Sequence, residues 1–129
     1  MKGAPHLKTG QIGEVKGVSY LKGLGYKILE TNYQTPLGEI DCILKDKKTV
    51  VFIEIKTRKG VAYGFPEEAV HEQKQQKIAR VAQWYLKSKG LIDKVPVRFD
   101  VLAVLMLDSS QFGFNHIKNA FEIEPKENI

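Results

Sequence analysis

The chain of 129 residues contains a single cysteine, Cys42, so it has no internal disulfide bond and no zinc site built from several cysteines. Residues 1–13 have no apolar core and do not resemble a signal peptide. No apolar run approaches the length of a membrane span. These absences predict a protein of a reducing compartment, and we expect it in the cytoplasm and away from membranes.

The sequence also lacks internal repeats and segments of low complexity. Its 43% hydrophobic and 27% charged residues are typical of a globular protein, and its length suits one domain. We therefore expect a single domain over residues 1–129, with flexible tails at 1–8 and 124–129. The 20 Lys and Arg against 15 Asp and Glu give a formal net charge of +5. This modest excess favours anionic partners, nucleic acid first.

The spacing of apolar and turn residues predicts two helices and five strands. Thr9 is predicted to cap a first helix over residues 10–24, which Gly25 ends. The apolar face of this helix would be Ile12, Val15, Val18 (or Tyr20), Leu21 and Leu24. Pro66 is predicted to open a second helix over residues 67–88. The predicted strands cover residues 26–33, 39–44, 49–57, 97–107 and 112–123. The order α-β-β-β-α-β-β indicates an α/β fold with one mixed sheet flanked by helices.

Polar residues interrupt two of these apolar strands. In the strand 49–57, Glu54 and Lys56 share a face with Phe52, because alternate side chains of a strand point to the same side. Burying such charges costs several kcal/mol unless a partner compensates them. In the strand 39–44, Asp41 shares a face with Glu39 and Ile43, whereas Ile40, Cys42 and Leu44 face the other side. If these strands form a hairpin, Asp41 approaches Glu54.

Two carboxylates beside a lysine predict a site for Mg²⁺ or Mn²⁺, which prefer oxygen ligands. Such a metal ion stabilises charge on a phosphate and activates a water molecule. A neighbouring lysine would hold that water or neutralise the developing charge. The residues alone leave a second interpretation open: Glu54 and Lys56 as a pair that faces solvent, and Asp41 as the cap of a turn.

Several motifs occur in one order along the chain: Gly13-Glu14, Gly38-Glu39-Ile40-Asp41, Val51-Phe52-Ile53-Glu54-Ile55-Lys56-Thr57-Arg58, Lys74-Gln75-x-Lys77-Ile78 and Arg98-Phe99-Asp100-Val101. In this combination the chain resembles the PD-(D/E)xK nuclease superfamily. More narrowly it resembles the YraN-like uncharacterised family, which is similar to archaeal-type Holliday junction resolvases. The chain departs from the superfamily's name at Ile40, where the name has proline.

The resemblance implies a restriction-endonuclease-like core of the order α-β-β-β-α-β. It implies that Asp41 and Glu54 are metal ligands together with the carbonyl of Ile55, and that Lys56 is the catalytic lysine. It also implies that Glu14, on the first helix, completes the metal site. On the residues alone, Glu14 is equally well a solvated side chain of a helix surface.

Contacts with nucleic acid are expected after the strand 49–57 and on the second helix. Arg58 and Lys59 would meet phosphates, and Tyr63 would stack on a base. Lys74, Lys77 and Arg80 recur every three residues and form one basic helix face, and the resemblance adds Gln75. Plain solvation of these charges is the alternative. We expect His71 and His116 at the surface, and Asp100 buried in a structural pairing.

The metal site and the resemblance together lead us to expect a Mg²⁺- or Mn²⁺-dependent endonuclease that hydrolyses phosphodiester bonds of DNA. The similarity to junction resolvases implies branched or junction DNA as the substrate and a homodimer as the assembly. A nucleic-acid-binding module of the same fold, with little or no catalysis, is the alternative. A metal enzyme acting on another phosphate ester is a third interpretation.

Overall fold

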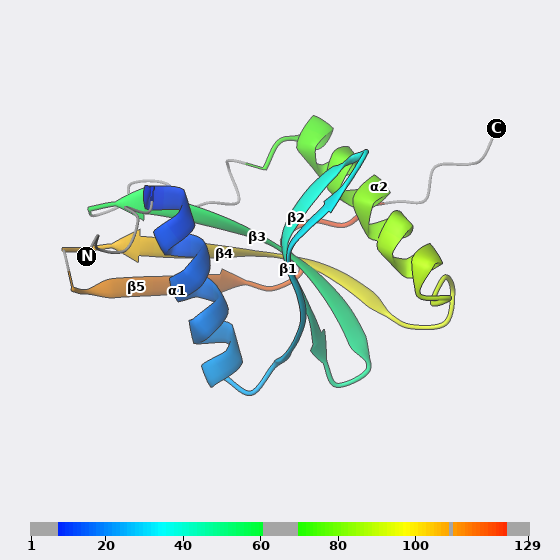
Figure 1. The fold of residues 1–129 in the computed structure, drawn as a ribbon, viewed down its shortest axis with the longest axis horizontal. Helices are drawn as coiled ribbons and strands as arrows, with labels where there is room; N and C mark the ends of the chain where they lie inside the picture. The colour runs from blue at the N-terminus through cyan, green and yellow to red at the C-terminus, as the bar shows by residue number, and fades with distance from the viewer. Residues whose placement is uncertain (1–7, 61–69, 109, 124–129) are drawn as a thin grey trace, which may run out of the picture.

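The computed structural model of the chain describes residues 8–60, 70–108 and 110–123. They form one five-stranded sheet with the strand order β1-β2-β3-β4-β5 and two helices (Figure 1). Strands β3 and β4 are parallel, and all other neighbouring strands are antiparallel. The elements are α1 (Thr9–Gly23), β1 (Lys27–Thr35), β2 (Gly38–Asp46), β3 (Thr49–Lys59), α2 (Glu72–Ser88), β4 (Val97–Met106) and β5 (Phe112–Ile117). The predicted α/β fold with a mixed sheet is confirmed, and the described residues contain no helix that is long and apolar enough to span a membrane.

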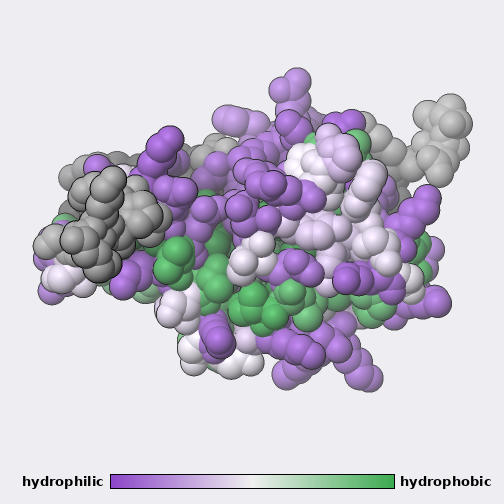
Figure 2. Space-filling model, in the orientation of Figure 1, coloured by the Kyte–Doolittle hydropathy of each residue, from purple (hydrophilic) through white to green (hydrophobic). Residues whose placement is uncertain are grey.

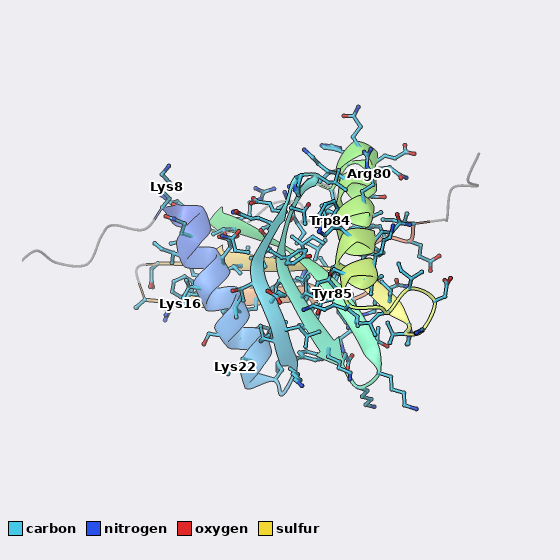
Figure 3. The ribbon with its side chains drawn as sticks, turned by 45° about the vertical axis from the view of Figure 1, so that its right-hand side comes forward. Lys8, Lys16, Lys22, Arg80, Trp84 and Tyr85 are labelled. Carbon is cyan, nitrogen blue, oxygen red and sulfur yellow. The ribbon has the colours of Figure 1, made fainter. Side chains whose placement is uncertain are left out.

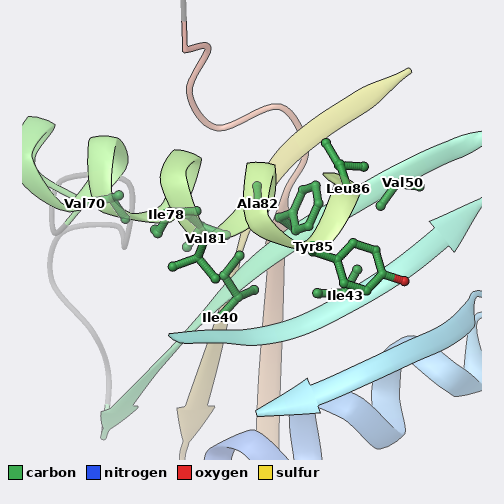
Figure 4. Packing of buried hydrophobic residues seen from close by; sticks show 11 residues of the cluster. Ile40, Ile43, Val50, Val70, Ile78, Val81, Ala82, Tyr85 and Leu86 are labelled. Atoms are coloured by element: carbon green, nitrogen blue, oxygen red, sulfur yellow. The ribbon is translucent and has the colours of Figure 1, made fainter. Parts of the chain in front are cut away.

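Strand β3 lies between two hydrophobic cores, as its continuous apolar run predicts. Phe52 belongs to the core beneath α2. Figure 4 shows Val81 and Tyr85 of α2 in this core. Ile53 and Ile55 belong to the core beneath α1. The alternation of side chains along β3 therefore divides the strand as expected, with Phe52 on the α2 side of the sheet.

Helix α1 contacts the sheet through two glycines as well as through part of the predicted apolar face. Its buried residues are Gly13, Gly17 and Leu21, so the predicted face is confirmed at Leu21. It is wrong at Val15, which is 60% exposed, and at Leu24, which is 55% exposed. A Cβ atom on Gly13 would lie 1.8 Å from Oγ1 of Thr57. The absence of side chains at these positions lets α1 approach β3 closely, which apolar periodicity does not reveal.

The ends of the elements follow local hydrogen bonds. Thr9 is the first residue of α1 and does not cap it, because Lys8 precedes the helix and its backbone N–H donates to Oε1 of Gln11 at 2.9 Å. Gly25 follows the helix with φ of +96°, so the predicted end is confirmed.

Helix α2 begins at Glu72, later than predicted. Val70 and His71 are not helical, and Pro66, which was predicted to open the helix, lies outside the described residues. The carbonyl of Val70 accepts a hydrogen bond from Nε2 of Gln75 at 2.9 Å, and the Val70 side chain is buried in the α2 core. His71, the residue before the helix, has extended backbone with φ of −72° and ψ of 161°.

Two other predictions about strands are wrong. Ile40 packs in the same core as Ile43 and not on the side of Cys42. The change of side occurs where β2 stops pairing with β3, since residues 38–40 pair with β1 alone. Strand β5 ends at Ile117 rather than at residue 123, since the chain turns at Asn119, where φ is +53°.

Asp100 is buried and paired, as predicted. Its carboxylate accepts hydrogen bonds from Arg98 at 2.9 and 3.0 Å and from the backbone N–H of Asn119 at 2.9 Å. Nε2 of His116 lies 2.7 Å from the same carboxylate, and the His116 side chain is only 8% exposed. The expectation that His116 lies at the surface is therefore wrong, because β5 brings it beside Asp100. His71 is exposed, as expected.

Candidate functional site

The site forms where strands β2 and β3 separate. Their last paired residues are Cys42 and Ile53. Beyond this pair, Oδ2 of Asp41 accepts a hydrogen bond from the backbone N–H of Ile55 at 2.7 Å. The side chain of Asp41 thus replaces the missing backbone acceptor and fixes its carboxyl group in the fork between the two strands.

Three carboxyl groups meet at this fork. Asp41 and Glu54 lie together in the wall of one cavity, and Glu54 and Glu14 of α1 both act on the pKa of Asp41. Burial, the charge of Glu54 and the hydrogen bond with Glu54 raise the pKa of Asp41 from 3.8 to about 8, although the N–H of Ile55 opposes the rise. The metal-free protein therefore holds Asp41 protonated at neutral pH, as expected for a carboxyl group beside another in a partly buried place.

Glu14 reaches the fork because α1 lies so close to β3. Gly13, the preceding residue, is buried against Thr57 of β3. Any larger residue at this position would push the helix away and carry Glu14 with it. The predicted placement of Glu14 near Asp41 therefore rests on a glycine contact.

Two lysines hold the carboxylate of Glu54, which is 7% exposed. Nζ of Lys56 lies 3.6 Å from Oε2 of Glu54, and Lys74 of α2 forms a closer ion pair with the same oxygen. Burial lowers the pKa of Lys56, and the charge of Lys74 adds to this effect while Glu54 opposes it. For Lys74, burial acts to lower the pKa, but the hydrogen bond and charge of Glu54 outweigh it and raise the pKa.

A cavity of about 590 Å³ opens over this cluster between β2, β3 and α2. Asp41, Glu54, Lys56, Lys74 and Lys77 lie in its wall with Glu39, the backbone turn at Gly38 and residues of β1. A second cavity, of about 490 Å³, lies on the α1 side and shares Ile55 and Lys56 with the first; Glu14, Arg58 and Lys8 line it. The acidic fork therefore lies between two hollows that each carry positive charge.

Surface views agree with this polar character. Hydrophilic side chains gather over the region between the start of α2 and the β1–β2 hairpin, at the top of the view in Figure 2. Figure 3 shows the two helices on either side of that hairpin, with Lys8 at the beginning of α1 and Arg80 on α2. Arg80 is exposed and lines neither cavity.

The structure brings most of the predicted site residues together. Asp41, Glu54, Ile55, Lys56 and Lys74 line the first cavity, and Ile55 lines both. Lys59 is exposed at the end of β3 and lines neither cavity, and Tyr63 lies outside the described residues. The side-chain amide of Gln75 donates a hydrogen bond to the carbonyl of Val70.

Residues from the ends of β1 and α1 complete the cavities and were not predicted from the sequence. Gln34 and Thr35 line the first, and Lys8, Thr9 and Gln11 line the second. Nothing in their local sequence marks them, because only the packing of the hairpin and of α1 brings them to the site.

The donor set partly fits a divalent cation. Carboxylate oxygens of Asp41, Glu54 and Glu14 are the ligands that Mg²⁺ and Mn²⁺ prefer, and the N–H of Ile55 keeps Asp41 in place. Among the residues that the structure describes, however, no group of three or more His, Cys, Asp or Glu side chains is arranged to hold a metal ion. Oε2 of Glu54 faces the ammonium groups of Lys56 and Lys74. The chemistry of the donors therefore suits a divalent cation, whereas the carboxylate of Glu54 is paired with lysines.

Known proteins are similar to this chain along most of its length. The sequence model of the uncharacterised protein family UPF0102 matches residues 13–104, a range that contains all the described residues of the first cavity. A UPF0102 protein of Clostridium botulinum (strain Loch Maree / Type A3) is 47% identical over 115 residues, which is 88% of this chain and 94% of that protein. A UPF0102 protein of Syntrophotalea carbinolica is 41% identical over 118 residues, covering 92% of this chain and 94% of that protein.

Proposed function

This chain belongs to the uncharacterised protein family UPF0102, and we propose that it is a metal-dependent DNA endonuclease of the PD-(D/E)xK superfamily with a restriction-endonuclease-like core. One observation carries the proposal. Asp41 and Glu54 hold their carboxyl groups against each other at the fork of β2 and β3, with Lys56 beside Glu54. Acidic groups paired in this way are stabilised by a divalent cation, which removes their mutual repulsion.

In the proposed mechanism, the residues that would hold Mg²⁺ or Mn²⁺ are Asp41, Glu54, Glu14 and, through its carbonyl, Ile55. Such an ion would supply positive charge for a phosphate oxygen and would lower the pKa of a water molecule. Lys56 stands beside Glu54 and orients the attacking water or neutralises charge on the phosphate in the transition state. Hydrolysis joins the water oxygen to phosphorus and breaks one P–O ester bond, and the leaving oxygen takes up a proton.

A nucleic acid is the substrate that fits the surroundings of the fork. Lys74 and Lys77 line one cavity, Arg58 and Lys8 line the other, and both cavities reach Lys56. A strand that crosses Lys56 would place phosphates against positive charge on each side of the scissile bond. Because both cavities flank the fork, the strand continues in both directions, which supports an endonuclease rather than an enzyme that needs a strand end.

The finer parts of the proposal follow from the resemblance to junction resolvases. Branched DNA is the proposed substrate, and cleavage of two symmetrically placed strands requires two copies of the site, hence a homodimer. We place this reaction in the cytoplasm.

A second function is supported by the pairing of Glu54 with Lys74. The carboxylate of Glu54 is paired with a lysine of the same chain. Such a pair is equally consistent with a nucleic-acid-binding module that has no catalytic activity. The two functions share the positive cavities and differ in whether the fork takes up a metal ion.

The proposal is tested on linear, single-stranded, flapped and four-way DNA with Mg²⁺ or Mn²⁺. We expect wild-type protein to cut at least one of these substrates, and Glu54→Gln to bind DNA without cutting it. Glu122→Gln, an exposed residue beyond β5, is the matched control and should cut like wild type. If wild type binds DNA but cuts none of these substrates, the endonuclease is rejected and the binding module is supported. Absence of binding at low salt would reject both functions.

A further inference from the structure

Lys74 is the side chain that joins α2 to the acidic fork. It lies in the first turn of the helix, which begins at Glu72, and its ammonium group forms an ion pair with Oε2 of Glu54. The two ends of the pair differ in their surroundings, since the Lys74 side chain is 46% exposed and that of Glu54 is 7% exposed. A half-exposed ammonium group thus neutralises a buried carboxylate.

Lys74 occupies the side of Glu54 that a metal ion would use. Oε2 of Glu54 faces both Lys56 and Lys74, and Asp41 lies in the wall of the same cavity. A divalent cation that used Oε2 would come close to both ammonium groups. Lys56 lies two residues from Glu54 on the same strand, whereas Lys74 comes from another element and can withdraw.

We infer that Lys74 acts as an internal substitute for the divalent cation, and that its ammonium group leaves Glu54 when a metal ion binds at the fork. This inference rests on the proposed metal site. Lys74 and the metal ion are alternatives because a buried carboxylate needs one cationic partner, and either of them supplies it. Once released, Lys74 stays in the wall of the same cavity as Lys77, where it meets the phosphates of a bound strand.

The inference predicts opposite effects for two substitutions of Lys74. Lys74→Met keeps the length of the side chain and removes its charge. Mn²⁺ then no longer competes with an ammonium group for Glu54, so the affinity of the protein for Mn²⁺ should rise about tenfold. Lys74→Arg offers a planar fork of donors that binds carboxylates more firmly, so Mn²⁺ should bind more weakly than to wild type. Both affinities are measured by titration with Mn²⁺, from the electron paramagnetic resonance signal of the free ion.

Thermal unfolding gives a second readout. In EDTA the Lys74→Met protein leaves Glu54 without its closest cation, so its unfolding midpoint should be lower than that of wild type. Saturating Mn²⁺ should raise the midpoint of Lys74→Met more than that of wild type, because the ion then replaces the missing partner.

Lys77→Met is the matched control, since Lys77 is an exposed lysine in the wall of the same cavity and its charge is removed in the same way. If Lys77→Met tightens Mn²⁺ binding as much as Lys74→Met, the effect is general electrostatics and the inference is overturned. Equal affinities of Lys74→Met, Lys74→Arg and wild type also overturn it, while the metal site itself stands. Absence of Mn²⁺ binding in every variant instead rejects the proposed function.

Discussion

Asp41 and Ile55 are joined by a hydrogen bond of 2.7 Å at the point where strands β2 and β3 stop pairing. The backbone N–H of Ile55 donates and the carboxyl group of Asp41 accepts, so the position of the acidic group is set by the sheet itself. This arrangement places a carboxyl group where its ionisation is unfavourable, and several consequences can be measured.

Asp41→Asn should make the metal-free protein more stable at alkaline pH. The folded-state pKa of Asp41 is raised from 3.8 to about 8, so the folded protein binds a proton that the unfolded chain releases. Its free energy of unfolding therefore falls as pH rises from about 4 to about 8. Asparagine keeps an oxygen for the N–H of Ile55 and removes this fall, with a gain on the order of a few kcal/mol above about pH 8.

Urea unfolding in EDTA at about pH 5 and about pH 8.5 measures the difference. Asp93→Asn is the control, because Asp93 is exposed and its φ of +60° suits asparagine. Equal pH dependence of wild type and Asp41→Asn would contradict the account.

Gly13→Ala should destabilise the protein and weaken the site at the same time. The new Cβ would lie 1.8 Å from Oγ1 and 2.8 Å from Cβ of Thr57, so α1 must move outward with Glu14. We expect a loss of about 1–3 kcal/mol in stability and weaker binding of Mn²⁺.

Gly10→Ala, in the same helix, is the comparison for this change. A Cβ at Gly10 meets no atom within 4 Å, so alanine should stabilise the helix by about 0.5–1 kcal/mol. Thermal unfolding and Mn²⁺ titration of both variants test the pair of predictions. A Gly13→Ala protein as stable as Gly10→Ala would show that the contact with Thr57 is unimportant.

Asp100→Asn should destabilise the protein at neutral pH and much less in acid. Burial acts to raise the pKa of Asp100, but hydrogen bonds from His116, Arg98 and the N–H of Asn119 outweigh it and lower the pKa. With a lowered folded-state pKa, the contribution of Asp100 is complete above about pH 4 and disappears as pH falls through the folded-state value. Breaking such a buried pairing costs about 3–5 kcal/mol.

Chemical denaturation of wild type and Asp100→Asn at about pH 7 and about pH 3 gives this comparison. The stability difference should shrink strongly at the lower pH. A difference that is the same at both values would mean that the charge of Asp100 does not contribute.

Lys56→Met should separate binding of the metal ion from cleavage. Nζ of Lys56 lies 3.6 Å from Oε2 of Glu54. In the proposed mechanism Lys56 orients the attacking water or neutralises charge on the phosphate in the transition state and does not bind the metal ion. We expect cleavage of DNA to slow by at least about 100-fold, with Mn²⁺ affinity equal to or higher than that of wild type. Lys45→Met, at an exposed position of β2, is the control. Unchanged cleavage by Lys56→Met would remove Lys56 from the catalytic residues.

Much of the fold follows from local patterns in the sequence. The hairpin of β2 and β3 was predictable because each strand is a run of apolar residues and a short polar turn joins them at Lys47 and Lys48. The alternation along β3 also predicted that Glu54 and Lys56 lie on the side of Phe52, which α2 covers.

The remainder depends on contacts between distant segments. The contact face of α1 was predicted at Leu21 but missed at Gly13 and Gly17, because glycine carries no hydrophobic signal although these two residues determine how near the helix lies. The pairing of His116 with Asp100 depends on the register of β5 against β4, which nothing in either strand specifies. Ile40 was assigned to the wrong core because perfect alternation fails where β2 leaves β3.

The candidate site was also predictable only in part from local sequence patterns. Strand alternation and the hairpin predicted that Asp41, Glu54 and Lys56 come together. Glu14 was identified only through the family resemblance. Lys74 was predicted from a basic helix face as a contact to nucleic acid, and its pairing with Glu54 was not predicted, because it depends on the packing of α2 against the sheet. The roles assigned to all five residues are still predictions.

The most direct test of the account is the rate of DNA cleavage by wild type and Asp41→Asn at the Mn²⁺ concentration that saturates the wild-type protein, with Asp93→Asn as the control for loss of one surface charge. The account predicts that wild type and Asp93→Asn cut equally fast, that EDTA stops both, and that Asp41→Asn is slower by at least about 100-fold although it is folded. Cleavage by Asp41→Asn at the wild-type rate, or cleavage by wild type that persists in EDTA, would contradict it.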